Sequence, residues 1–133
     1  MIPVIDFKAD NVLKQIEDAY TTVGFAVFTN CLSTSEQTDM NCWFNEMKNF
    51  FALDHNTKMK YPYEGDTNLG YSKVGDENVD PTAPKDLKES FNYNNTRMGN
   101  HLWPTGLPGF KATALQSINV ADKLTLRILE KFD

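Results

Sequence analysis

A chain of 133 residues can form one domain with a buried core, and a hydrophobic content of 41% excludes a disordered protein. The net charge of −5 reflects 18 acidic and 13 basic residues, and the lysines are scattered among acidic residues. The sequence therefore argues against nucleic-acid binding, which requires cationic groups gathered near the phosphates.

The first third of the chain predicts a strand, a helix and a second strand. Residues 2–7, IPVIDF, are β-branched and aromatic and have strand length. Apolar residues then recur at helical spacing from Val12 to Val23, and Gly24 suits the end of this helix. Because GFAVFTN (24–30) is another apolar run of strand length, the order predicts a β-α-β unit.

A second helix is expected after residue 33. Ser33 and Glu36 have the spacing of a capping box. The helix carries an apolar stripe of Met40, Trp43, Phe44, Met47, Phe50 and Phe51. Sulfur-containing and aromatic side chains at this spacing are typical of a protein core and not of a cofactor site. Asp54 can cap one more helical turn through Met59.

The second half predicts loops, short strands and a last helix. Residues 60–86 are rich in glycine and proline, with a short strand in GYSKV, and ESFNYN (89–94) alternates aromatic and polar residues as a half-buried strand does. The last helix is expected from about Lys111 to the end, with an apolar face of Leu115, Ile118, Ala121, Leu124, Ile128 and Leu129. It shows no stop signal, so we expect a chain that is cut off from something the helix packs against.

These elements predict an α+β fold with about three main helices packed on a small mixed β-sheet of IPVIDF, GFAVFTN and ESFNYN. The two cysteines, Cys31 and Cys42, predict reduced thiols, because a disulfide framework or a zinc site uses more or closer cysteines. No signal peptide and no run of 18 apolar residues is visible. We therefore expect a cytoplasmic protein without a membrane partner.

Residues 97–110, RMGNHLWPTGLPGF, raise the question of a metal site because they contain His101. A non-haem iron site uses two histidines and one carboxylate. The other histidine is His55, and neither is followed two residues later by a carboxylate. Nucleophile elbows and phosphate-binding glycine motifs are also absent from the sequence. We predict no catalytic, metal-binding or cofactor-binding residues here; Trp103 is expected to be buried, and Pro108 and Gly109 to lead into the last helix.

Six motifs in order resemble the N-terminal region of iron(II)/2-oxoglutarate-dependent dioxygenases, in the branch that contains isopenicillin N synthase. They are IPVIDF, GFAVFTN, FFALDHNTKMK, GYSKVG, DLKESFNYN and WPTGLPGF. The chain departs from the family where the pattern NHGI reads NCLS at 30–33, and where Asp54 replaces a proline. The resemblance extends from Ile2 through the last helix.

The resemblance implies that residues 1–133 are a non-haem dioxygenase N-terminal domain, the N-terminal portion of a double-stranded β-helix oxygenase that is truncated before its catalytic domain. In the family, the iron ligands and the arginine that binds 2-oxoglutarate lie on a following jelly roll, which is the expected missing or separate partner. A full-length relative would use Fe(II) and 2-oxoglutarate on a small organic substrate, and this chain alone is expected to be inactive. Because the family's GYSKVG region supplies substrate contacts, Asn68, Tyr71 and Ser72 are candidate substrate-binding residues, with a loop-shaping role as the alternative.

Two other hypotheses remain open. The chain could be a non-enzymatic interaction module or partner subunit that docks through an exposed sheet edge and its terminal helix. It could also be a decayed fragment without a function.

Overall fold

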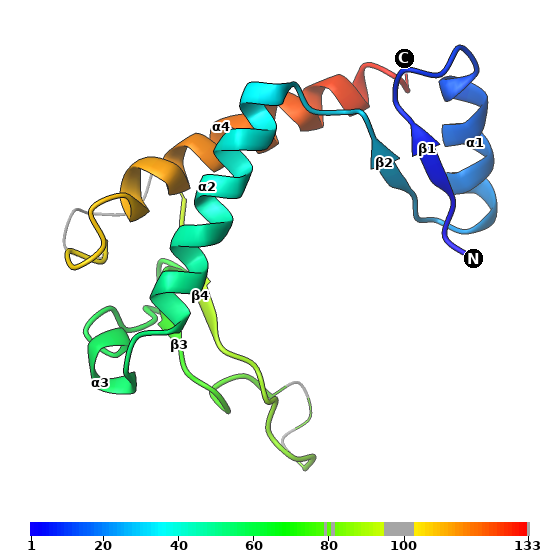
Figure 1. The fold of residues 1–133 in the computed structure, drawn as a ribbon. Coiled ribbons are helices and arrows are strands. Elements are labelled where there is room, and N and C mark those ends of the chain that lie inside the picture. Colours follow the sequence, from blue (N-terminus) through cyan, green and yellow to red (C-terminus); the bar gives the residue numbers. More distant parts are fainter. Residues whose placement is uncertain (79, 81, 95–102, 133) are drawn as a thin grey trace.

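The computed structural model describes residues 1–78, 80, 82–94 and 103–132. The elements within these residues follow the order β1 (Val4–Asp6), α1 (Val12–Thr22), β2 (Val27–Thr29), α2 (Thr34–Phe51), α3 (His55–Lys58), β3 (Gly70–Ser72), β4 (Ser90–Asn92) and α4 (Phe110–Leu129) (Figure 1). The long helices α2 and α4 pack against each other, and α1 is the third main helix. The predicted α+β class is therefore confirmed, and α3 is the extra turn expected after Asp54.

The strands form two separate two-stranded sheets. β1 pairs with β2 in parallel, with Val4 opposite Val27, and β3 pairs with β4 in antiparallel, with Tyr71 opposite Phe91. The segment ESFNYN therefore joins the GYS strand and not the one sheet that we expected. Its alternation specifies which face is buried, but the choice of pairing partner depends on packing between distant segments.

The β1–α1–β2 unit has a small core of its own. Ile5, Val12, Ile16 and Ala19 are buried there, and Phe7, Ala26 and Phe28 pack against them. Helix α1 covers the face of the sheet that carries Ile5. Because side chains alternate along a strand, Val4 and Val27 lie on the opposite face, where they are 65% and 49% exposed.

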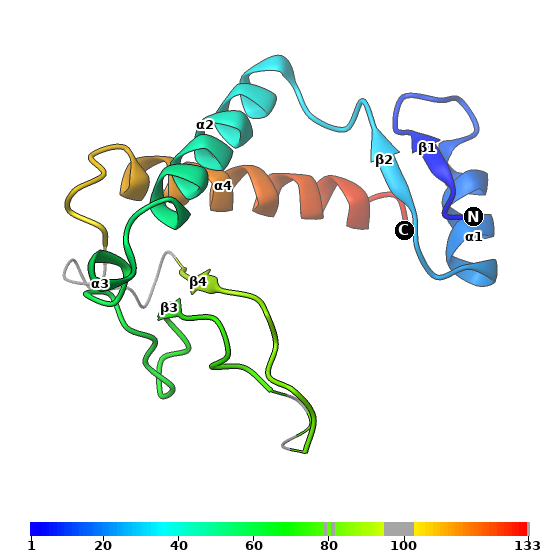
Figure 2. The same ribbon diagram turned by 60° about the horizontal axis from the view of Figure 1, so that its bottom comes forward.

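The β1–α1–β2 unit lies beside the C-terminal end of α4 and away from β3 and β4 in both views (Figure 2). Arg127 of α4 binds the segment that leads from β2 into α2. Its Nη2 lies 2.6 Å from Glu36 Oε1, and its Nη1 donates a hydrogen bond of 3.1 Å to the carbonyl oxygen of Cys31. The rings of Tyr20 and Phe132 meet edge to face nearby, with their centroids 5.5 Å apart.

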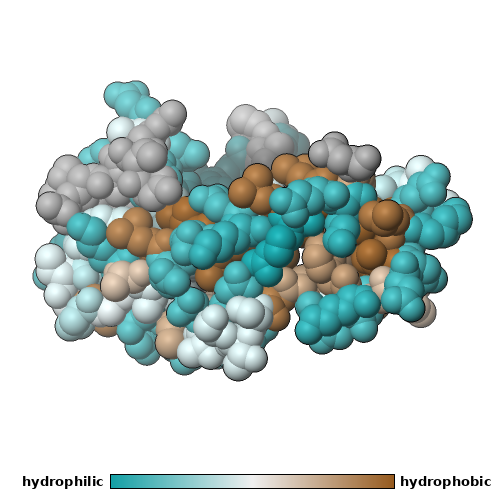
Figure 3. Space-filling model, turned by 90° about the horizontal axis from the view of Figure 1, so that it is seen from above, coloured by the Kyte–Doolittle hydropathy of each residue, from teal (hydrophilic) through white to brown (hydrophobic). Residues whose placement is uncertain are grey.

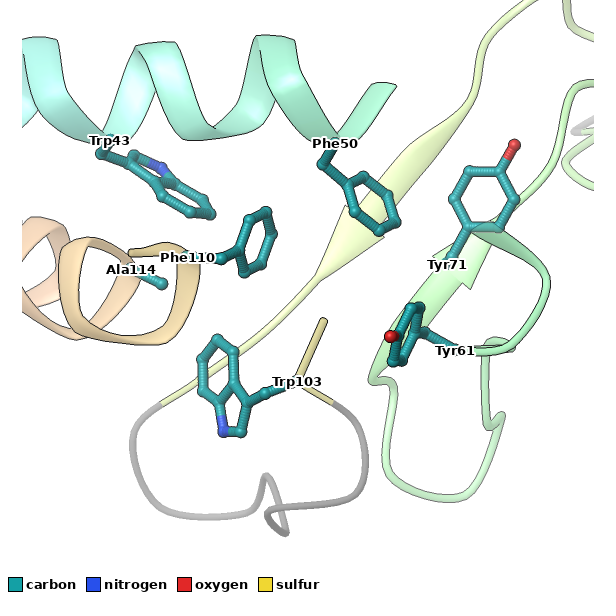
Figure 4. Packing of buried hydrophobic residues seen from close by; sticks show 7 residues of the cluster. All are labelled: Trp43, Phe50, Tyr61, Tyr71, Trp103, Phe110 and Ala114. Carbon is teal, nitrogen blue, oxygen red and sulfur yellow. The ribbon is translucent and has the colours of Figure 1, made fainter. Parts of the chain in front are cut away.

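The main core is an aromatic cluster between α2, α4 and the β3–β4 sheet. Figure 4 shows its buried residues Trp43, Phe50, Tyr61, Tyr71, Trp103, Phe110 and Ala114 (Figure 4). The rings of Phe50 and Phe110, both fully buried, have centroids 5.4 Å apart. The burial of Trp103 confirms the prediction, and Gly109 stands immediately before α4, as expected. His101 lies outside the described residues.

The buried face of α4 agrees only in part with the predicted one. Its buried residues are Phe110, Ala114, Ser117 and Val120, whereas Ala121 and Leu129, which were expected on the apolar face, are exposed. Leu115, Ile118, Leu124 and Ile128 are half-buried, and Leu115 packs against the main core, so the prediction was wrong only for Ala121 and Leu129. Ser117 is tolerated there because its hydroxyl donates a 2.7 Å hydrogen bond to the Ala114 carbonyl oxygen.

The predicted caps of α2 and α3 are present. The Glu36 backbone N–H donates to Ser33 Oγ at 3.2 Å, and the Ser33 N–H donates to Glu36 Oε2 at 2.8 Å. The Thr57 N–H donates to Asp54 Oδ1 at 3.0 Å. Each bond satisfies a helix N-terminal group that has no partner within its helix. None of the helices in the described part of the chain has the length and apolar character needed to cross a bilayer.

Candidate substrate-binding site

A tight turn at residues 68–70, immediately before β3, positions the candidate residues. Gly70 has φ +100°, and a Cβ atom at this position would lie 2.3 Å from the carbonyl oxygen of Pro62. Asn68 has φ +57°, a left-handed conformation that asparagine tolerates better than most residues. Gly70 pairs with Asn92 across the sheet, so this turn places Asn68 close to Asn92 of β4.

Two adjoining hollows share Asn68 and Asn92. One has a volume of about 390 Å³ and is lined by Thr67, Asn68, Phe91, Asn92, Tyr93 and Asn94. The other has a volume of about 270 Å³ and is lined by Tyr63, Asn68, Ser72, Asp76, Glu77 and Asn92. A larger hollow of about 630 Å³ lies between β2 and the start of α2, but it contains none of the predicted site residues.

Asn68 forms hydrogen bonds with two neighbours in the hollows. Its Oδ1 accepts a 3.0 Å bond from the hydroxyl of Tyr63 and a 3.1 Å bond from Nδ2 of Asn92. Ser72 is only 5% exposed, and its hydroxyl has no partner among the described residues. No fully buried polar side-chain atom of the described residues lacks a hydrogen-bond partner, so the Ser72 hydroxyl retains some solvent access, and Ser72 lines the smaller hollow.

Tyr71 lies on the other face of β3. It is 2% exposed, and its ring centroid is 5.8 Å from that of Phe50. Its hydroxyl donates to Glu89 Oε2, and the ammonium group of Lys58 lies 2.7 Å from the same oxygen. Lys58 also donates a 3.2 Å bond to the carbonyl oxygen of Phe51. We call Lys58, Tyr71 and Glu89 the buried triad.

The buried triad keeps Glu89 charged and Tyr71 protonated. Burial, followed by the hydrogen bond to Glu89, raises the pKa of Tyr71 well above its usual value. Burial by itself would raise the pKa of Glu89, but the hydrogen bonds from Lys58 and Tyr71 outweigh it, so the pKa of Glu89 is lowered. The triad therefore contains an ionised carboxylate bound by two donors.

The structure thus places Asn68 and Ser72 at one hollow and directs the ring of Tyr71 into the core. Sequence reasoning missed Asn92, although the alternation in ESFNYN places it on the polar face beside Ser90. It also missed the pairing of Lys58 with Glu89, for which the sequence contains no local signal.

The described residues do not fit an iron site. They contain no group of three or more histidine, cysteine, aspartate or glutamate side chains that could hold a metal ion. His55 is exposed on α3. The described part of this chain therefore does not contain the set of ligands that an Fe(II) site requires.

Comparison with known proteins identifies the class of domain to which this chain belongs. The family described as "non-haem dioxygenase in morphine synthesis N-terminal" matches residues 2–106. The chain therefore belongs to this family, which confirms the resemblance seen in the six sequence motifs.

Solved structures extend the likeness over nearly the whole chain. A full-length Neurospora crassa protein in complex with alpha-KG has a TM-score of 0.77 and 25% identity, covering 98% of this chain and 45% of that one. The same protein in complex with alpha-KG and thymine has a TM-score of 0.73 and 26% identity, and the match covers 93% of this chain and 45% of that one. A 2OG-Fe(II) oxygenase family protein from Caulobacter crescentus has a TM-score of 0.74 and 23% identity, and the match covers 98% of this chain and 47% of that one. The chain thus spans less than half the length of these structures. No curated protein matches it.

Proposed function

We propose that residues 1–133 form the N-terminal domain of an iron(II)/2-oxoglutarate-dependent oxygenase that modifies a small organic substrate. The iron ligands and the 2-oxoglutarate site would belong to a jelly-roll catalytic domain, in a longer product or in a separate chain. The family match over residues 2–106 is the observation that carries this proposal. The hollow beside β3 and β4, which contains Asn68 and Ser72, supports a contribution to substrate binding.

A neutral heterocycle is the first substrate class to test. One of the structural neighbours was solved with alpha-KG and thymine, and it is 26% identical to this chain. Asn68 and Ser72 are uncharged hydrogen-bonding groups, as recognition of such a ring requires. The hydroxyl of Tyr71 is already bound to Glu89. A role of Tyr71 in substrate binding stays a prediction.

Exposed apolar side chains support docking against a further domain. Val4 and Val27 occupy the uncovered face of the β1–β2 sheet, and Leu126, Leu129 and Phe132 are exposed at the C-terminal end of α4. Hydrophobic patches interrupt the hydrophilic surface in the space-filling view from above (Figure 3). Such patches are typical of interaction surfaces, and the catalytic jelly roll is the occupant that we propose.

The alternative function, a non-enzymatic interaction module, would use the same surface. Within the described residues, the β1–β2 sheet has strand edges without a strand partner, and such edges can pair with another chain, whereas Tyr61 and Tyr63 hydrogen-bond to Tyr71 at the outer edge of β3. The partner distinguishes the two functions, because only the first requires a partner with a 2-oxoglutarate site. The expected cytoplasmic location stays a prediction.

The coding DNA and its neighbouring genes provide the test. We expect a segment that encodes His-x-Asp, a later histidine and Arg-x-Ser, in frame with this chain or close to it. The product that includes this segment should convert 2-oxoglutarate to succinate with Fe(II), whereas the 133-residue chain alone should not. Absence of such a segment would contradict the proposal and favour the interaction module.

A further inference from the structure

We propose that Asn68, Ser72 and Asn92 form a subsite for the amide edge of an uncharged, planar ring. An amide edge is a hydrogen-bond donor beside an acceptor, as in a lactam or a cyclic imide. The inference deepens the proposed function, and it rests on that function only in taking the bound ring to be the substrate.

The two asparagines present one donor and one acceptor. Asn68 Oδ1 accepts from Tyr63 and from Asn92 Nδ2, which leaves Asn68 Nδ2 and Asn92 Oδ1 without a partner among the described residues. Exchanging oxygen and nitrogen in both amides preserves the network and leaves an acceptor on Asn68 and a donor on Asn92. Either assignment complements a ligand that carries an acceptor beside a donor.

Ser72 adds an independent feature of a built site. Its side chain is more than nine-tenths buried, yet its hydroxyl has no partner in the described part of the chain. Buried polar groups are normally hydrogen-bonded, so a nearly buried hydroxyl that opens into a hollow indicates a ligand or a bound water. The hydroxyl can donate to or accept from a ring substituent next to the amide edge.

The walls of the hollows favour an uncharged planar molecule. Asp76 and Glu77 line the smaller hollow, and among the described residues no lysine or arginine lines either one. Glu77 is engaged by Lys88 at 2.6 Å and by the Ser90 hydroxyl at 3.0 Å. The carboxylates of Asp76 and Glu77 would repel an anionic ligand. A cationic ligand would have to compete with Lys88 for Glu77. The aromatic side chains of Phe91 and Tyr93 line the larger hollow and offer apolar contact to a ring.

The subsite rests on a fixed base. Ser72 and Asn92 project from paired strands, and the buried triad anchors the opposite face of β3 through Tyr71. Preorganised side chains lose less entropy when a ligand binds, which favours recognition by few hydrogen bonds.

A titration followed by NMR tests the subsite, with uracil as the probe. Uracil is a neutral ring with amide edges, and 1,3-dimethyluracil keeps the ring but has no N–H donor. We expect uracil to shift the signals of Asn68, Ser72 and Asn92 in the ¹⁵N-labelled chain. Because 1,3-dimethyluracil lacks the N–H donor, it should form one hydrogen bond fewer and bind about five- to tenfold more weakly than uracil. Equal affinity for the two probes, or no shift at these residues up to the solubility limit of uracil, would overturn the subsite.

Two variants separate binding from folding. Ser72→Ala removes a hydroxyl that has no partner, so it should leave the urea midpoint unchanged and weaken uracil binding by about fivefold. Asn92→Asp should abolish the uracil-induced shifts, while Asn45→Asp makes the same chemical change at an exposed position of α2 and should leave them intact. Unchanged uracil affinity in Ser72→Ala would remove Ser72 from the proposal. Uracil-induced shifts that persist in Asn92→Asp would contradict the proposed role of the paired Asn68 and Asn92 amides.

The failure of this inference is distinct from failure of the proposed function. Succinate formation by a longer product, together with no uracil-induced shift at Asn68, Ser72 and Asn92, would overturn the subsite alone. Uracil binding at these residues without succinate formation by the longer product would contradict the oxygenase function and leave the subsite standing.

Discussion

Lys58 Nζ lies 2.7 Å from Glu89 Oε2, and this ion pair joins α3 to the residue that precedes β4. The two side chains are 10% and 26% exposed, and the Tyr71 hydroxyl donates to the same carboxylate oxygen. The ion pair and the Tyr71 hydrogen bond together connect three segments of the chain beneath the candidate substrate-binding site.

Replacing Lys58 by methionine should destabilise the fold. The substitution keeps most of the aliphatic stem but leaves Glu89 with an uncompensated, partly buried charge. We expect a loss of about 1–3 kcal/mol in the free energy of unfolding, measured by urea titration at pH 7. The control is Lys14→Met, which removes an exposed pair with Asp18 and should change stability by less than about 1 kcal/mol. Equal effects of the two variants would contradict a structural role for the Lys58–Glu89 pair.

The same pair predicts a pH dependence. Because the folded-state pKa of Glu89 is lower than its ordinary value of 4.5, the stabilisation is fully present above about pH 4.5. It is lost as the pH falls through the folded-state pKa, where the carboxylate becomes protonated. Glu89→Gln should therefore be less stable than the unmodified chain at pH 7, and the difference in unfolding free energy should shrink at pH 3. A difference that stays constant between these pH values would count against an ionised Glu89.

Gly70 should not tolerate a side chain. Gly70→Ala would place a Cβ 2.3 Å from the Pro62 carbonyl oxygen at φ +100°, so either β3 or the Pro62 segment must shift. We expect a cost of about 2–3 kcal/mol in unfolding free energy. Gly65→Ala is the matched control, because nothing lies within 4 Å of its added Cβ, and it should stay within about 0.5 kcal/mol. Similar thermal midpoints for the two variants would show that the close approach at Gly70 does not constrain the fold.

The aromatic cluster should depend on α2 side chains according to their burial. Phe50 is fully buried and packs edge to face against Tyr71 and Phe91, whereas Phe44 on the same helix is 58% exposed. Phe50→Ala should cost about 3–5 kcal/mol, and Phe44→Ala less than about 1 kcal/mol, in urea unfolding followed by tryptophan fluorescence. A larger effect at Phe44 would contradict the assigned core face of α2.

Local sequence rules predicted much of this fold. The capping box of Ser33 and Glu36, the turn after Asp54 and the β-α-β opening each depend on residues close together in the chain, and the structure contains all three. The pairing of β3 with β4 and the exposure of Ala121 and Leu129 on α4 were missed, because packing between distant segments decides both. Three-residue strands contain too little pattern to select their partners.

The candidate site was predictable to a similar extent. The family resemblance led to Asn68 and Ser72, which line one hollow, and the alternation of side chains along a strand separates Ser72 from the inward-facing Tyr71. Asn92 reaches the site only through the β3–β4 register, and the Lys58–Glu89 pair only through the tertiary fold. Neither contact could be read from spacing in the sequence.

Succinate formation from 2-oxoglutarate in the presence of Fe(II) is the most direct test of the proposed function. The purified 133-residue chain should release no succinate above a blank containing metal alone, because its described residues contain no cluster of iron ligands. The longer or paired product that carries the jelly-roll segment should release succinate when a substrate is supplied. Turnover by the 133-residue chain alone would contradict the assignment of this chain as an N-terminal domain that depends on a separate catalytic domain.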